Sequence, residues 1–172
     1  LLVFDESKAG AAAVLRAVEL GVAGLKAPMA ATFANGKIYV AMFQSGSGVA
    51  EVDVASGPYA VRGCPYLSGH LVHNVHAFTV YGRAEVFVND LGNSLWKPYV
   101  SGNGLVHLDP RTCTYNTSTV VNLPPDGMHV RASAQDLDDP SIVYALTQEP
   151  GGQPSKLFVL RLLGGGGGGG GA

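Results

Sequence analysis

Three histidines follow one another at intervals of three residues, at His70, His73 and His76. Three imidazoles are enough to bind zinc and to leave one coordination position open. On a strand, His70 and His76 face one side and His73 faces the other, so only a helical turn would bring the three rings together. Gly69 precedes this group and a strand-like sequence follows it. We therefore expect a strand here and no metal site.

The cysteines and one short motif bear on the compartment of the protein. Cys64 and Cys113 do not have the spacing of metal ligands, and they fit either a disulfide in a secreted protein or two buried thiols. Asn116 begins an Asn-Thr-Ser sequon, which is an acceptor for N-glycosylation only in the secretory pathway. The chain starts at Leu1 as if inside a strand, so the localisation stays open between cytoplasmic and secreted.

The amino-acid composition favours one class of fold and argues against some kinds of partner. The chain has 172 residues, of which 47% are hydrophobic, and this is sufficient for one domain with a core. Only 14% of residues are charged, whereas glycine (24) and proline (10) are frequent, which favours short strands joined by turns. The net charge of −2 and the lack of a basic run argue against nucleic acid. No apolar stretch reaches the roughly 20 residues of a membrane helix, so we expect no membrane partner.

Strand-like segments recur along the chain in three units. Asn35-Gly36 lies between apolar runs and is a strong hairpin signal. The second strands of the units align at Ile38, Val86 and Val143, which are 48 and 57 residues apart. A period near 50 residues with several short strands per unit is typical of β-propeller blades. The expected strands are residues 30–33, 37–41, 49–54, 75–80, 85–89, 104–109, 130–134, 142–146 and 156–161.

The predicted fold is therefore all-β, with about three consecutive four-stranded antiparallel blades of a larger ring, which we expect to have seven. Residues 1–163 form this partial propeller domain, led by a strand at residues 1–5. Three units are fewer than the four to eight blades that close a propeller, so we expect a fragment. Residues 9–25 suit either a helix or a loop followed by a strand within residues 14–20. The glycine-rich tail, residues 164–172, can bury nothing and is interpreted as a linker or low-complexity segment.

Two stretches resemble a known family. The segments VHAF (residues 75–78) and VFVNDLGNSLW (residues 86–96) resemble the histidine-led strand and the D-L-x-x-N-x-L-W turn of lactonase-type seven-bladed propellers. The segments DGMHVR (residues 126–131) and VYALTQE (residues 143–149) resemble their G-x-H-P-R strand and Y-A-L-x-E segment. The family includes 6-phosphogluconolactonase and the fungal carboxy-cis,cis-muconate cyclases, and the cyclases are the closer match. The resemblance covers about residues 28–163.

The resemblance implies an active cleft at one end of the central channel, with His76, Arg131 and Glu149 as catalytic residues. Gln148 could take the place of Glu149, because the preceding loop is longer here than in the family. Val130 stands where the family has proline. The residues that the resemblance places around the substrate are His73, His129, Gln148 and Asn89.

The implied substrate is a carboxylated small molecule or its lactone, and no metal or organic cofactor is expected. Arg131 would pair with a carboxylate through its planar guanidinium, and His76 would act as general acid with Glu149 orienting it. The same groups suit a lactonizing isomerase and a lactone hydrolase, so the direction stays open. The alternative is a non-catalytic secreted propeller glycoprotein used for binding, which the sequon, the cysteine pair and the missing proline favour. The oligomeric state is not determined.

Overall fold

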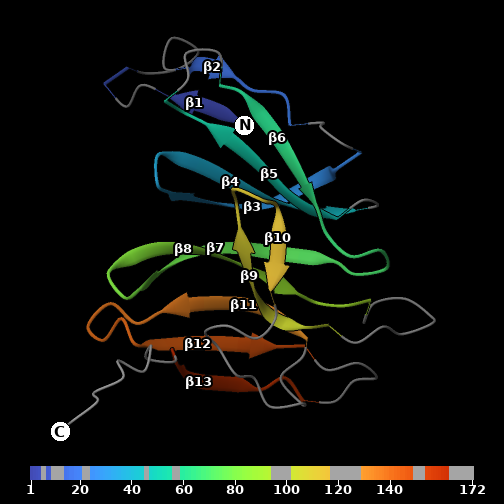
Figure 1. The fold of residues 1–172 in the computed structure, drawn as a ribbon, viewed down its shortest axis with the longest axis vertical. Helices are drawn as coiled ribbons and strands as arrows, with labels where there is room; N and C mark the ends of the chain where they lie inside the picture. The colour runs from blue at the N-terminus through green and yellow to red at the C-terminus, as the bar shows by residue number, and fades with distance from the viewer. Residues whose placement is uncertain are drawn as a thin grey trace, which may run out of the picture.

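A computed structural model describes residues 1–4, 7–8, 14–20, 24–44, 47–55, 59–93, 102–116, 129–148 and 154–162. All regular secondary structure in these residues is β, arranged as three antiparallel sheets that follow a two-stranded sheet (Figure 1). Within the described residues there is no helix long and apolar enough to span a bilayer.

Each sheet is formed by strands that are consecutive in the sequence. The two-stranded sheet pairs β1 (Leu2–Phe4) with β2 (Val14–Ala17). The first sheet contains β3 (Lys26–Ala34), β4 (Lys37–Gln44), β5 (Gly48–Asp53) and β6 (Val61–Pro65). The middle sheet contains β7 (Val72–Val80), β8 (Arg83–Asp90), β9 (Gly104–Asp109) and β10 (Thr114–Asn116). The third sheet contains β11 (Val130–Gln135), β12 (Ile142–Thr147) and β13 (Leu157–Arg161).

Two-residue turns connect the first two strands in the first and middle sheets. Asn35 and Gly36 have φ values of 51° and 76°, and Tyr81 and Gly82 have values of 50° and 72°. When both central residues of a two-residue turn have positive φ, the twist of the turn matches that of the two strands that it connects. The Asn35-Gly36 hairpin predicted from the sequence is therefore confirmed, and Tyr81-Gly82 is its counterpart in the middle sheet.

The sheets stack face to face, and alternate residues of one strand contact different neighbours. On β8, Val86 and Val88 pack toward the first sheet, whereas Phe87 packs toward the third sheet. A further apolar cluster joins the first sheet to the segment around Val18 and Leu20. Because successive side chains of a strand point to opposite faces, the middle sheet is buried on both sides.

The first strands of the three sheets lie next to one another. β7 contacts β3 on one side and β11 on the other, so these three strands form one edge of the stack (Figure 1). The ends at which these strands begin therefore lie close together. This edge carries the histidines and the arginine that the sequence indicates as a site.

The all-β prediction is confirmed, and most predicted strands fall within the observed ones. Ile38, Val86 and Val143 lie in β4, β8 and β12, the second strand of each sheet. Of the two alternatives for residues 9–25, the described Val14–Ala17 is a strand. Four strands per unit were expected, but the third sheet has three among the described residues, and the described sheets form no closed ring. The glycine-rich tail lies outside the described residues.

Candidate functional site

A β-bulge occurs at the same place in the first strand of each sheet. In β3 the pairing skips Met29, in β7 it skips His73, and in β11 it skips Arg131. Each bulged residue is the second or fourth residue of its strand. At this position the first strand of each sheet pairs with the last residues of the second strand. A bulge redirects a side chain out of the regular alternation. The three sheets therefore present Met29, His73 and Arg131 from equivalent positions.

The guanidinium of Arg131 is held by a side chain from the adjacent strand. Its Nη1 atom donates a hydrogen bond to Oε1 of Gln148, which directly follows β12. The backbone N–H of Gln148 donates to the carbonyl oxygen of His129 at 2.9 Å, and this bond extends the pairing of β11 with β12. Among the described residues, no carboxylate pairs with Arg131. A half-buried guanidinium thus remains available to an anionic ligand.

His73 lies beside Arg131. Its Nδ1 atom is 3.0 Å from the carbonyl oxygen of Arg131, and because a carbonyl only accepts, Nδ1 carries the proton and Nε2 is the free acceptor. The ring of Phe43 packs edge-on against the imidazole at 5.6 Å. Burial and then the positive charge of Arg131 lower the pKa of His73, although the hydrogen bond to the carbonyl acts in the opposite direction. His73 is therefore neutral at pH 7.

His76 lies deeper along β7, on the face that contacts the third sheet. Its ring stacks on Phe78 with an interplanar angle of 10° and a centroid distance of 5.6 Å. Its Nε2 atom is buried and has no hydrogen-bond partner among the described residues. Burial lowers the pKa of His76 to about 4, because the charged imidazolium loses its hydration. The imidazole is neutral at pH 7, which does not suit a general acid but suits a neutral hydrogen-bonding group.

Asn89 and His129 connect the middle sheet to the third sheet. The side-chain amide of Asn89 is fully buried and lies 3.0 Å from Oγ of Ser133. With its nitrogen toward Ser133, its oxygen accepts from the backbone N–H groups of Ala132 at 3.3 Å and Ser133 at 3.2 Å. Nδ1 of His129 lies 3.1 Å from the carbonyl oxygen of Leu91. Both residues therefore support the backbone around the bulge of β11, and we expect them to position Arg131.

A buried carboxylate that the sequence did not single out as catalytic lies at the same end. Asp90, the last residue of β8, is fully buried and accepts hydrogen bonds from the hydroxyl of Tyr66 and from the backbone N–H groups of Gly92 and Asn103. The side-chain amide of Asn103 donates a further bond at 2.9 Å. Nδ1 of His70 lies 2.9 Å from Oδ2 of Asp90. The pairing of Asp90 with His70 has no local signal in the sequence.

The three histidines of the His70 to His76 segment have different partners. His70 contacts Asp90, His73 contacts the backbone of Arg131, and His76 stacks on Phe78. Among the described residues, no group of three His, Cys, Asp or Glu side chains has the arrangement of a metal site. Glu149 lies outside the described residues.

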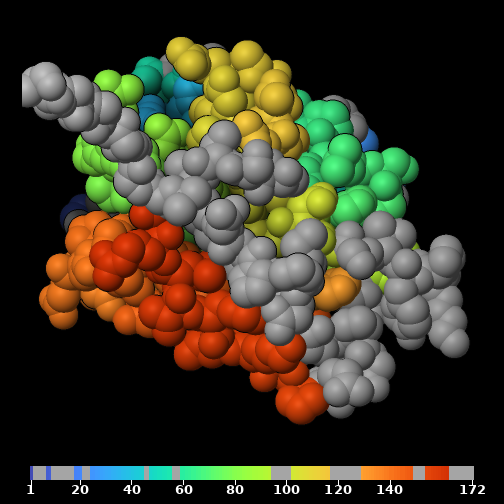
Figure 2. All heavy atoms as spheres, turned by 60° about the horizontal axis from the view of Figure 1, so that its bottom comes forward, coloured from blue at the N-terminus to red at the C-terminus, as the bar shows by residue number. Residues whose placement is uncertain are grey.

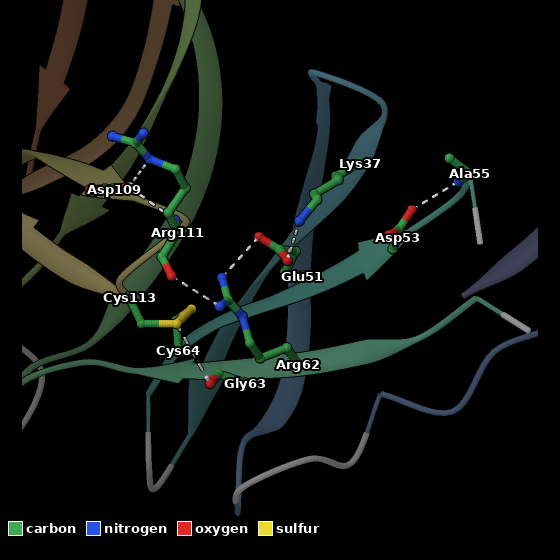
Figure 3. A network of polar contacts seen from close by, with 10 residues as sticks. All are labelled: Lys37, Glu51, Asp53, Ala55, Arg62, Gly63, Cys64, Asp109, Arg111 and Cys113. Atoms are coloured by element: carbon green, nitrogen blue, oxygen red, sulfur yellow. Dashed lines mark hydrogen bonds and ion pairs between the residues drawn. A yellow bond between two sulfur atoms is a disulfide. The ribbon is translucent and has the colours of Figure 1, made fainter.

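A second polar region joins the outer parts of the first and middle sheets. The carboxylate of Glu51, with a side-chain exposure of 6%, lies 2.7 Å from Nζ of Lys37 and 3.3 Å from Nη2 of Arg62 (Figure 3). Arg62 also donates to the backbone carbonyl of Arg111 at 3.2 Å. Burial and the nearby Glu51 raise the pKa of Tyr39 to about 12, so its phenol stays protonated.

A disulfide bond lies in the same region of the molecule. Cys64 of β6 is bonded to Cys113, which precedes β10, so the bond links the first sheet to the middle sheet (Figure 3). An open cleft of about 700 Å³ lies nearby, lined by charged side chains that include Lys37, Glu85 and Asp109. These three already have described partners, namely Glu51, His107 and Arg111 respectively. This region therefore holds the sheets together, and the better candidate site is the end with Arg131.

The fold and the site define an all-β protein of stacked antiparallel meanders, with a guanidinium and neutral histidines at one end. Comparison with protein-family profiles, with curated proteins and with solved structures found no match. The function proposed below is therefore supported by the site geometry and by the sequence resemblance.

Proposed function

We propose that the chain is part of a lactonase-type β-propeller that binds a carboxylated small molecule at the starts of its inner strands and forms or opens a lactone. The observation that carries this proposal is the pair of bulges that places His73 beside Arg131, with Gln148 holding the guanidinium. Bulges are frequent next to active sites, and a planar guanidinium is well suited to carboxylate.

The packing of the sheets supports the propeller architecture. Three consecutive meanders stack with their first strands adjacent, as successive blades of a propeller do. On the outer face of the third sheet, Leu146, Leu157 and Val159 are 42%, 65% and 64% exposed. Figure 2 shows β12 and β13, in orange to red, at the surface of the molecule. An apolar sheet face of this kind needs a cover, and a further blade of the same type would supply it.

Arg131 is assigned to the substrate carboxylate. Gln148 uses one N–H of the guanidinium, and within the described part of the chain the other four donors remain for a ligand. Two parallel N–H···O bonds to a carboxylate fix both its position and its orientation. The neutral ring of His73 can accept a hydrogen bond from the rest of the substrate at Nε2 without repelling the guanidinium.

The test is an assay of the full-length protein with carboxymuconate, for lactone formation, and with a sugar-acid lactone, for hydrolysis. Arg131→Gln and His73→Gln should reduce turnover of the accepted substrate, whereas Arg161→Gln, at an exposed arginine of β13, should not. Absence of turnover with both substrates, or full activity of Arg131→Gln, would refute the proposed function.

The second candidate is a secreted propeller that binds ligands without catalysis. It is favoured by the disulfide between Cys64 and Cys113 and by the exposure of Asn116, the first residue of the sequon. Disulfides persist mainly in oxidising compartments, where the sequon would be a substrate for glycosylation. Mass spectrometry of protein from secreting eukaryotic cells should detect a glycan that Asn116→Gln removes. Binding of the carboxylate to a protein that has no turnover would then favour this candidate.

A further inference from the structure

The pairing of His70 with Asp90 points to a catalytic role for residues other than Arg131, His73 and Gln148. We propose that His70 is the general base that activates water for lactone opening, and that Asp90 positions it. This inference rests on the proposed function and adds a direction to it, namely hydrolysis.

The carboxylate oxygens of Asp90 accept hydrogen bonds from several donors. The backbone N–H groups of Gly92 and Asn103 lie 2.7 Å from its two oxygens, and the hydroxyl of Tyr66 lies 2.9 Å from Oδ2. Backbone N–H groups can only donate, so both oxygens act as acceptors. Burial and the nearby negative charge raise the pKa of Tyr66, so its hydroxyl also remains a donor. Nδ1 of His70, at 2.9 Å and 3.1 Å from these oxygens, must therefore carry its proton.

This hydrogen bond fixes the tautomer of His70. With the proton on Nδ1, Nε2 is the basic nitrogen, and it makes no hydrogen bond with a described residue. The side chain is 14% exposed, so water can reach it. A buried carboxylate at Nδ1 orients the ring and stabilises the imidazolium that forms when Nε2 takes a proton. This is the arrangement that general-base catalysis by histidine requires.

His73 and His107 also make polar contacts, but these contacts suit a general base less well. His73 donates to a neutral carbonyl and lies beside Arg131, whose positive charge opposes protonation of the ring. His107 contacts Glu85 at 3.0 Å, but this carboxylate is 36% exposed, and among the described residues only His107 forms an ion pair with it. Among the residues that the structure describes, only the pair of His70 and Asp90 combines a buried, fully bonded carboxylate with an accessible imidazole.

His70 also lies at the appropriate end of the molecule. It precedes β7 by two residues, and Asp90 ends β8. The backbone N–H of Leu71 donates to Gly92, while the carbonyl of Leu91 is within 3.1 Å of Nδ1 of His129. These hydrogen bonds connect the residues that follow His70 and Asp90 in the sequence to His129, which precedes β11 and Arg131.

In the proposed step, Nε2 of His70 removes a proton from water while the water oxygen bonds to the lactone carbonyl carbon. The carbonyl π electrons move to the carbonyl oxygen and give a tetrahedral alkoxide. Collapse of this alkoxide breaks the bond to the ring oxygen, which takes the proton from His70. The products are a hydroxyl group and a carboxylic acid, so one lactone and one water give one hydroxy acid. No metal ion or redox partner takes part in this step.

The experiment measures kcat and KM of the full-length protein for a sugar-acid lactone between pH 5 and 9. His70→Gln should lower kcat by about 10²- to 10⁴-fold with little change in KM, the range typical of a lost general base. The dependence of kcat on pH should differ between the wild type and His70→Gln. His107→Gln, the same change at the other histidine–carboxylate pair, should keep the wild-type rate and pH profile.

Two further variants distinguish a catalytic role of His70 from a purely structural one. Imidazole added to His70→Ala should restore part of the rate in proportion to its concentration, which a purely structural role would not produce. Tyr66→Phe removes another bond to Asp90 and should leave most of the activity. If His70→Gln retains full hydrolysis, or loses no more than Tyr66→Phe, the role of His70 is refuted while that of Arg131 stands. If the wild type forms a lactone from carboxymuconate but opens none, the role of His70 in hydrolysis is refuted and the proposed function stands, whereas turnover of neither substrate refutes the proposed function.

Discussion

The Nδ1 atom of His73 lies 3.0 Å from the carbonyl oxygen of Arg131, and this contact joins the bulge of β7 to the bulge of β11. The two residues belong to different sheets and are 58 positions apart in the sequence. Each bulge turns its residue out of the regular strand pairing, and the contact fixes one bulge against the other. The candidate site is therefore a property of two neighbouring sheets together.

Arg131 should determine affinity for carboxylates. Arg131→Lys keeps the positive charge but loses the planar pair of donors, and Arg131→Gln also loses the charge. Loss of charge-assisted hydrogen bonds of about 1.5–3 kcal/mol should raise Kd for the carboxylate about 10- to 100-fold. Isothermal titration calorimetry measures this change, with Arg161→Gln as the control. Equal affinities of wild type and Arg131→Gln would contradict the assignment.

His76 should make the stability of the fold depend on pH. Its pKa is about 4 in the folded protein and near 6.5 in the unfolded chain, so the unfolded state binds the extra proton between these values. The contribution is fully present above pH 6.5 and is lost as the pH falls toward 4. The total loss is about 3 kcal/mol, at roughly 1.4 kcal/mol per pH unit.

Urea unfolding of wild type and His76→Leu at several pH values between 4 and 7.5 tests this prediction. The difference in unfolding free energy between the two proteins should change by about 3 kcal/mol across this range. Leu160→Ala, in the same apolar cluster, should lower stability by a similar amount at every pH. A pH dependence that persists unchanged in His76→Leu would contradict the assignment.

The disulfide should stabilise the contact between the first and middle sheets. The cysteines are 49 residues apart, and a loop of this length corresponds to about 4 kcal/mol of lost unfolded-state entropy. The double variant Cys64→Ala, Cys113→Ala should therefore unfold at a markedly lower denaturant concentration. A reductant should lower the midpoint of the wild type and leave that of the double variant unchanged. Identical midpoints for the oxidised wild type and the variant would show that the bond is absent in solution.

Asn89 should support the bulge that carries Arg131. Asn89→Ala removes a fully buried amide that bonds to Ser133, and it should reduce the free energy of unfolding by about 1–3 kcal/mol. A double-mutant cycle with Ser133→Ala measures how much of this change belongs to the pair. Asn74→Ala, at the half-buried residue paired with Asn89 in the sheet, should have a smaller effect. Additive effects of Asn89→Ala and Ser133→Ala would exclude a direct interaction.

Local sequence signals were sufficient to predict most of the strands. Alternating apolar residues around Val86 and Val143 predict the second strands, and Asn35-Gly36 predicts a turn, because side-chain alternation and positive φ depend on adjacent residues. The short strands β6 and β10 were not predicted. β6 contains Arg62, Gly63 and Pro65, which give no clear alternation, and β10 has three residues.

The amino-acid sequence by itself determined that the chain is all-β, that its strands recur in three units, and that histidine and arginine occur near the starts of the first strands of these units. Only the tertiary structure decided which of these side chains meet. Bulges redirect His73 and Arg131, and stacking of the sheets buries His76 and lowers its pKa. The pairing of His70 with Asp90 depends on a chain reversal between residues 20 positions apart. Such contacts depend on sheet packing and register, which no short stretch of sequence encodes.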